Sequence, residues 1–158
     1  MNAPPRALVI GIGNMYRQDD GAGLAVAARV RLAAPPGVQT RELGGELVTL
    51  LDMWGDAPVV YLADAVRSGG TPGRVYRFDA RAGMPPAGPF GHRGTHTFSV
   101  ADTIELARSL GRLPGQLIGY GIEGADFGNG TSMSPEVASA VHAVTTRLLA
   151  ELSAGAAR

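Results

Sequence analysis

A glycine-rich turn near the N-terminus constrains the fold of this chain more than any other segment. The apolar residues 7–10 before it predict a buried strand, and the amphipathic residues 24–32 after it predict a helix. Between them, residues 11–23 combine several glycines with two adjacent carboxylates, Asp19 and Asp20. A strand, a glycine-rich turn and a helix in this order are typical of α/β folds whose first loop contributes to a binding site.

The two carboxylates argue against a dinucleotide site at this turn. Such a site needs a third glycine so that the backbone can approach the pyrophosphate, and Tyr16 stands at that position. Asp19 and Asp20 would also place negative charge where a phosphate should lie. One of them is expected to cap the following helix, because a carboxylate satisfies free N–H groups there. The second carboxylate indicates a cation site.

Composition predicts a single domain over residues 1–158, long enough to bury a core. The 14 basic and 14 acidic residues balance, so charge favours neither nucleic acid nor an anionic membrane as a partner. No apolar run approaches the roughly 20 residues of a membrane span, and the first residues predict no signal peptide. The absence of cysteine excludes thiolate metal ligands and is consistent with a cytoplasmic protein.

The rest of the chain alternates predicted strands with predicted helices. The expected strands are residues 38–43, 58–64, 73–79 and 116–122, and the expected helices are residues 46–54, 97–113 and 134–152. The strand at 73–79 is predicted to lie at an edge, and residues 80–95 form a long loop rich in glycine and proline. We therefore expect an α/β fold of three layers, in which a five-stranded, mostly parallel sheet of flavodoxin-like strand order carries helices on both faces.

Two carboxylates are expected to meet at one edge of this sheet. Asp20 follows the first strand and Asp64 ends the third, and these strands are neighbours in a flavodoxin-like order. Such sheets bind ligands beyond the carboxyl ends of their strands. Asp64 has an alternative role as a turn residue, but an acid that ends so apolar a strand is costly to bury without a partner.

His96 is the histidine best placed to join the two carboxylates, because it precedes a predicted helix on a loop that can fold over the crevice. His92 lies four residues earlier, but a glycine between the two argues against helical ligand spacing. His142, between valines of the last helix, is expected to be a surface or packing residue. Asp20, Asp64 and His96 form a mixed oxygen and nitrogen set that suits zinc or nickel and leaves a coordination position open.

In these residues the chain resembles the hydrogenase maturation endopeptidases. The most specific match is Gly11-x-Gly13-Asn14 followed by Asp19-Asp20-Gly21-x-Gly23. The other matches in order and spacing are Asp64-Ala65, Thr95-His96, Gly121-Ile122-Glu123 and Ser134-Pro135-x-Val137. The resemblance runs from about residue 7 to residue 149, and its strength lies in the combination of these short motifs.

The resemblance implies an aspartyl-type endopeptidase that removes the C-terminal extension of a nickel–iron hydrogenase large-subunit precursor after nickel insertion. It also implies that Asp20, Asp64 and His96 are the metal-binding and catalytic residues, and that they sense nickel held by the substrate. Zinc or another divalent ion is the alternative occupant. Water activation by a Lewis-acid metal and by a carboxylate acting as general base both remain open.

Two positions depart from the family pattern: Gly45 stands where threonine is frequent, and Thr97 stands where glutamine is frequent. Both changes bear on which client the protein recognises. Two other functions also remain open. The first is a non-catalytic nickel-sensing chaperone for a hydrogenase-like client, which would not cleave a nickel-loaded precursor. The second is a nucleotide-binding α/β protein built on Gly11 and Gly13, which would bind a mononucleotide or dinucleotide tightly.

Overall fold

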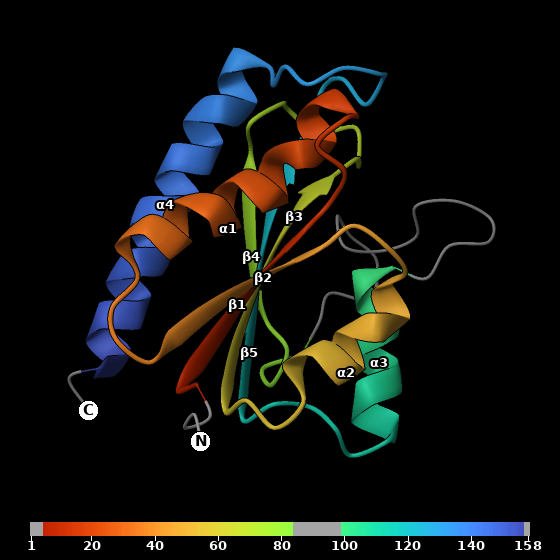
Figure 1. Cartoon of the computed structure of the whole chain (residues 1–158). Helices are drawn as coiled ribbons and strands as arrows, with labels where there is room; N and C mark the ends of the chain where they lie inside the picture. The colour runs from red at the N-terminus through yellow and green to blue at the C-terminus, as the bar shows by residue number, and fades with distance from the viewer. Residues whose placement is uncertain (1–4, 84–98, 157–158) are drawn as a thin grey trace.

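Helices and strands alternate along the chain, as Figure 1 shows. The computed structural model describes residues 5–83 and 99–156. The strands are β1 (Ala7–Ile12), β2 (Val38–Leu43), β3 (Val59–Val66), β4 (Val75–Asp79) and β5 (Gln116–Glu123). The α-helices are α1 (Ala22–Ala33), α2 (Leu50–Trp54), α3 (Val100–Ser109) and α4 (Pro135–Ala156). The 3-10 helices η1 (Gln18–Gly21) and η2 (Leu47–Thr49) directly precede α1 and α2.

The strands form one sheet in the order β2-β1-β3-β5-β4. Strands β1, β2, β3 and β5 run parallel, and β4 pairs with β5 in the antiparallel direction. The five-stranded, mostly parallel sheet, the neighbouring first and third strands and the edge position of residues 73–79 are thereby confirmed. The parallel strands follow the flavodoxin-like order, and β4 adds an antiparallel edge beyond β5.

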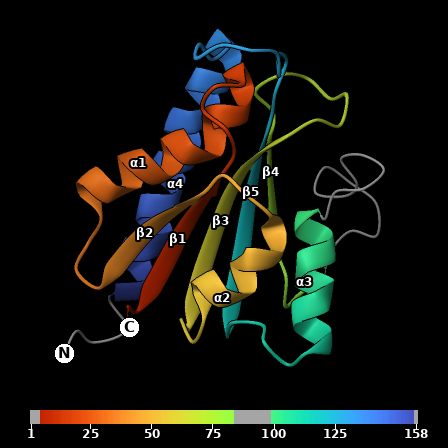
Figure 2. The ribbon, with the colours of Figure 1, turned by 45° about the vertical axis from the view of Figure 1, so that its right-hand side comes forward.

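Helices cover both faces of the sheet and so complete the predicted three layers (Figure 2). Helices α1 and α4 pack on one face, and α2 and α3 pack on the other. The alternation of side chains along β3 explains how one strand serves both cores. Val60 and Leu62 join the cluster under α2 and α3, whereas Tyr61 and Ala63 join the cluster under α1 and α4. Within the described ranges, no helix is long and apolar enough to cross a membrane.

Several predicted boundaries differ from the structure. Helix α3 ends at Ser109 and not at residue 113, and α4 runs to Ala156 and not to residue 152. Residues 46–54 form η2 and the short helix α2 in place of one α-helix. The prediction that Asp64 ends its strand is wrong, because β3 continues to Val66, which pairs with Glu123 of β5. Asp64 instead lies opposite Ile12, the last residue of β1. The predicted loop at 80–95 lies mostly outside the described residues, as does the predicted start of the helix at 97–113.

Close contact between α1 and the sheet explains two glycines of the first turn. A Cβ atom on Gly11 would lie 2.4 Å from the carbonyl oxygen of Gly23. A Cβ atom on Gly23 would lie 2.3 Å from the carbonyl oxygen of Ala63 and 2.4 Å from that of Ile12. These glycines therefore let the first turn of α1 rest on the backbones of β1 and β3, a packing role that needs no bound phosphate.

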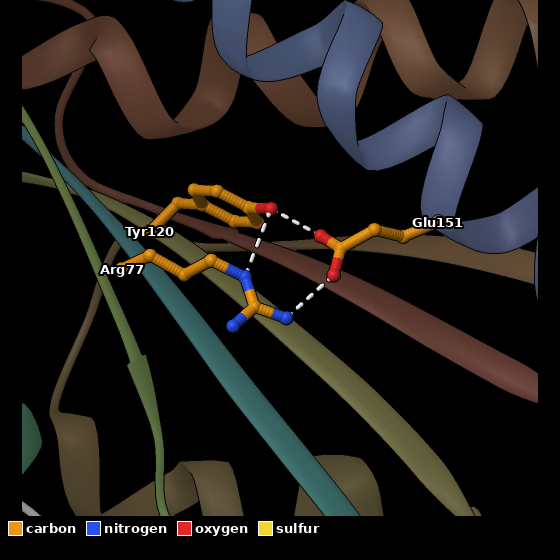
Figure 3. A network of polar contacts seen from close by, with 3 residues as sticks. All are labelled: Arg77, Tyr120 and Glu151. Atoms are coloured by element: carbon orange, nitrogen blue, oxygen red, sulfur yellow. Dashed lines mark hydrogen bonds and ion pairs between the residues drawn. The ribbon is translucent and has the colours of Figure 1, made fainter.

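A polar network ties the edge strand β4 to α4 across β5 (Figure 3). Arg77 forms an ion pair with Glu151 at 2.5 Å, and its Nε donates to the hydroxyl of Tyr120 at 3.2 Å. The same hydroxyl donates to the other carboxylate oxygen of Glu151. Burial, together with the hydrogen bond to Glu151, raises the pKa of Tyr120 to about 12, so its phenol stays protonated at neutral pH.

The contact at Gly23 predicts a marked effect of a single added methyl group. We expect Gly23→Ala to lower the free energy of unfolding by about 2 kcal/mol, because both clashing atoms are backbone oxygens that cannot rotate away. In thermal unfolding followed by circular dichroism, this corresponds to a fall in melting temperature of about 4–8 °C for a domain of this size.

Gly45→Ala is the matched control, because no heavy atom of residues 5–83 and 99–156 lies within 4 Å of the position its Cβ would take. We expect it to change the free energy of unfolding by less than about 0.5 kcal/mol. Equal melting temperatures for the two variants would contradict the packing role of Gly23.

Candidate functional site

The turn after β1 folds tightly around Asp20. Gly13 has a φ of 148°, and a Cβ atom there would lie 2.0 Å from the carbonyl oxygen of Asp20. The backbone N–H of Asn14 donates to Asp20 Oδ2 at 3.0 Å and to the carbonyl oxygen of Asp20 at 3.2 Å. Asp20 is partly exposed. Its carboxylate is therefore held against Asn14, which lies two residues beyond the end of β1 at Ile12.

Asp64 lies at the same end of the sheet. It pairs with Ile12 and shares the α2 and α3 face of β3 with Leu62 and Val66. Only 2% of its surface is exposed. A carboxylate is costly to bury unless hydrogen bonds, an opposite charge or a cation compensate it, which is why such groups are typical of functional sites. The end of β1 thus brings Asp20 and Asp64 into one neighbourhood.

The third predicted ligand, His96, lies outside the described residues, and so does His92. Among the residues that the structure describes, no three His, Cys, Asp or Glu side chains gather in a way that could hold a metal. A site of three ligands therefore stays a prediction that depends on His96. His142 of α4 is exposed, which agrees with its predicted place on the surface.

Neither acid of the first turn caps α1. Gly21 is the N-cap of α1, and no side chain forms a cap hydrogen bond at the start of η1 or α1. The prediction of a capping carboxylate is wrong, because both side chains turn toward other backbone amides: Asp20 binds Asn14, and Asp19 binds a loop far away in the sequence.

Asp19 holds the loop between β5 and α4. Its side chain is fully buried (0% exposed). Its oxygens accept hydrogen bonds from Ala125 N (2.8 Å), Asp126 N (2.9 Å), Ser134 N (2.7 Å) and Ser134 Oγ (2.8 Å). Burial by itself would raise the pKa of this carboxyl, but the bonds from Ser134, Asp126 and Ala125 outweigh burial and hold the pKa below 3.8. Asp19 is therefore an ionised anchor inside the protein.

Gln18, the residue before Asp19, also holds the loop between β5 and α4. Its Nε2 donates to the carbonyl oxygen of Asn129 at 2.8 Å, and its Oε1 accepts from Ser132 N at 3.1 Å. Gln18 also has a φ of 54°, the one positive value for a non-glycine residue in the described ranges. Such backbone conformations are costly and persist where surrounding contacts enforce them. Nothing in the sequence pattern marked Gln18 for this role.

A second buried carboxylate, Glu123, holds the connection between β3 and β4. It is 1% exposed and lies at the end of β5. Ser68 N donates to its Oε2 at 2.8 Å, Tyr76 OH donates to its Oε1 at 2.9 Å, and the hydroxyl of Ser68 also donates to Oε1. Burial alone would raise the pKa of Glu123, but these bonds hold it below 4.5. In the sequence, Glu123 stood out only as part of the Gly-Ile-Glu motif.

A stacking contact joins the connections anchored by the two buried carboxylates. The guanidinium of Arg67, between β3 and β4, lies 5.3 Å from the ring centre of Phe127, between β5 and α4. The carbonyl oxygen of Phe127 in turn accepts from Arg17 Nε at 3.2 Å. Three connections at this end of the sheet are thereby linked into one rim, at the end where Asp20 and Asp64 also lie.

The anchoring role of Asp19 predicts a large and pH-dependent stability effect. We expect Asp19→Asn to lower the free energy of unfolding by about 3 kcal/mol at neutral pH, because an amide nitrogen would face buried donors. The folded pKa of Asp19 lies below 3.8, so its contribution is complete above that pH and is lost as the pH falls through the folded value. Urea unfolding of both proteins should therefore show a difference that shrinks below about pH 3.8.

Asp126→Asn is the matched control, since the exposed side chain of Asp126 accepts one bond, from Gly128 N at 2.9 Å, which an amide oxygen can also accept. It should change the free energy of unfolding by less than about 0.5 kcal/mol. A gap between wild type and Asp19→Asn that stays constant from pH 7 to pH 2 would contradict the ionised anchor.

Comparison with known proteins identifies the family. The HycI model, described as hydrogenase maturation protease, matches residues 30–151, well over half of the chain. The hydrogenase expression/formation protein HupD of Rhodobacter capsulatus is 29% identical over 159 residues, which cover 96% of this chain and 73% of that protein. HupD of Thiocapsa roseopersicina is 29% identical over 140 residues, covering 87% of this chain and 63% of that protein.

Solved structures share the fold. Hydrogenase maturating endopeptidase HybD from E. coli superposes with a TM-score of 0.77 at 19% identity, over 95% of this chain and 93% of that one. A hydrogenase 2 maturation peptidase from a Thaumarchaeota archaeon superposes with a TM-score of 0.64 at 27% identity, over 93% of this chain and 97% of that one. From the family match and the shared fold we conclude that this chain belongs to the hydrogenase maturation protease family and is an endopeptidase.

Proposed function

We propose that this protein removes the C-terminal extension of a nickel–iron hydrogenase large-subunit precursor once nickel has been inserted. Membership of the hydrogenase maturation protease family is the observation that carries this proposal. The relatives named HupD take part in hydrogenase expression and formation, which agrees with a hydrogenase precursor as the client. The precursor is therefore the partner that we expect the site to bind.

Asp20 and Asp64 are the residues of the described chain that we assign to this recognition, with His96 as the third ligand. Support comes from their common place at the end of β1, one partly exposed and one buried. Two carboxylates and an imidazole suit nickel or zinc and leave room for a further ligand. We propose that the set completes the coordination of an ion that the precursor already holds.

The chain's own contribution to cleavage is to orient the scissile segment beside these carboxylates. The ion supplies Lewis-acid polarisation of the scissile carbonyl or a lowered pKa of a water molecule. Asp20 is the better candidate for a general base, because its carboxylate is partly exposed whereas that of Asp64 is buried. The hydrogen bond from Asn14 fixes the direction of the Asp20 carboxylate.

Removing either charge should stop processing without unfolding the protein. We expect Asp20→Asn and Asp64→Asn each to lower the rate of precursor cleavage at least about 100-fold, since an amide keeps the shape of the side chain but loses the charge that a metal needs. The measurement is a gel-shift assay for the shortened subunit, with melting curves to verify folding. Asp126→Asn, at an exposed acid of the loop before α4, is the control and should cut like wild type. Equal loss in all three variants would contradict this division of roles.

Cleavage should also depend on metal in the substrate. We expect wild type to cut nickel-loaded precursor in the presence of a chelator that strips free ions, and to leave metal-free precursor intact. His96→Ala should cut neither. Efficient cutting of metal-free precursor would contradict recognition of substrate nickel, and rescue of His96→Ala by zinc would indicate a resident ion. A wild-type chain that binds loaded precursor but never cuts it would favour the chaperone alternative.

A further inference from the structure

A groove of about 260 Å³ lies beside the turn that carries Asp20. One wall is the first half of α1, and the other comes from the loop that precedes α4. Its main lining residues are Met15, Leu24, Ala25, Ala28, Met133 and Glu42. In both Figure 1 and Figure 2 the loop before α4 lies close to the start of α1. The lining is mostly apolar, and Glu42 is its charged member.

The groove exposes apolar side chains of a kind that a folded domain normally buries. Met15 is 54% exposed, and Tyr16 beside it is also exposed. The other large apolar side chains that are exposed in the described ranges, Leu32, Val48 and Leu110, lie one by one elsewhere and do not line the groove. Single exposed apolar residues need no explanation, whereas a lined apolar recess indicates a binding surface.

The wall formed by the loop before α4 is fixed in advance. Gln18 holds Ser132 through its side-chain oxygen and Asn129 through its side-chain nitrogen. Asp19 holds Ser134 through both carboxylate oxygens. Met133 therefore sits between two anchored residues. A pre-organised wall loses little conformational freedom when a ligand binds, which favours affinity.

The groove adjoins the turn that carries Asp20. Gln18 and Gly21, on either side of Asp20 in η1, both contribute to its lining. An extended peptide advances roughly 3.3 Å per residue, so a chain that passes Asp20 reaches the groove within a few residues. A volume of about 260 Å³ is below the roughly 300–1,000 Å³ typical of small-molecule pockets, and is suited to a single side chain.

We infer that this groove is a specificity subsite that binds one bulky apolar side chain of the precursor segment flanking the scissile bond. The inference rests on the proposed function, because it takes the precursor as the occupant. Two methionines in the lining adapt to side chains of different shape, so the subsite accepts several apolar residues. Glu42 and Asp20 disfavour an acidic residue next to the apolar one, because like charges would face each other.

Two variants test the subsite in different ways, and a third serves as control. Met15→Gln removes an apolar wall, and Ala28→Phe fills the groove from α1. Leu32→Gln is the matched control on the same helix, 86% exposed and outside the groove. The substrate is a nickel-loaded large-subunit precursor that wild type cuts. We expect both groove variants to raise KM about tenfold with kcat little changed, the effect of losing binding shared by ground and transition states. Leu32→Gln should leave both constants unchanged.

A substitution series in the substrate identifies the occupant. Each apolar residue within about four positions of the scissile bond is replaced by serine in turn, a reach set by the extended-chain spacing. One replacement should raise KM for wild type about tenfold and have little further effect on Met15→Gln, because coupled partners are not additive. Unchanged KM in both groove variants, or additive effects for every substrate position, would overturn the subsite while leaving the proposed function intact. Failure of wild type to cut any loaded precursor would overturn both.

Discussion

The buried carboxylate of Asp19 is the interaction on which the candidate site depends. Asp19 links the turn after β1 to the loop before α4, because Ala125, Asp126 and Ser134 all donate hydrogen bonds to its side chain. A charge inside a protein is tolerable when each of its lone pairs meets a donor, and the lowered pKa of Asp19 reflects that condition. Asp20, the adjacent residue, is thereby set at the rim.

Four acids at this end of the sheet therefore divide into two kinds. Asp19 and Glu123 are saturated with hydrogen bonds from the protein and hold connecting segments in place. Asp20 and Asp64 stand at the end of β1 and are the acids assigned to the ligand. In the proposed function, the same side-chain chemistry serves structure at Asp19 and Glu123 and recognition at Asp20 and Asp64. This division explains why adjacent aspartates need not share a function.

Periodicity and turn composition predicted the sheet, its layers and the edge strand. They could do so because the spacing of apolar residues and the positions of glycines determine locally where strands, helices and turns form. The predicted helix start at Ser134-Pro135 also agrees with α4, which begins at Pro135. The extension of β3 beyond Asp64 could not be read from the sequence, because it depends on pairing with β5. The roles of Asp19 and Gln18 were hidden for the same reason: their partners lie more than 100 residues away.

That separation has a consequence for how the enzyme is made. Asp19 and Ser134 are 115 residues apart, so closing the loop between them carries a high entropic cost and requires β5 to be docked first. On the ribosome, Asp19 emerges long before its partners, and the rim cannot assemble until Ser134 has been synthesised. A nascent or truncated chain would thus carry its acidic residues without a shaped cleft. Assembly of this end of the sheet is therefore a late event of folding.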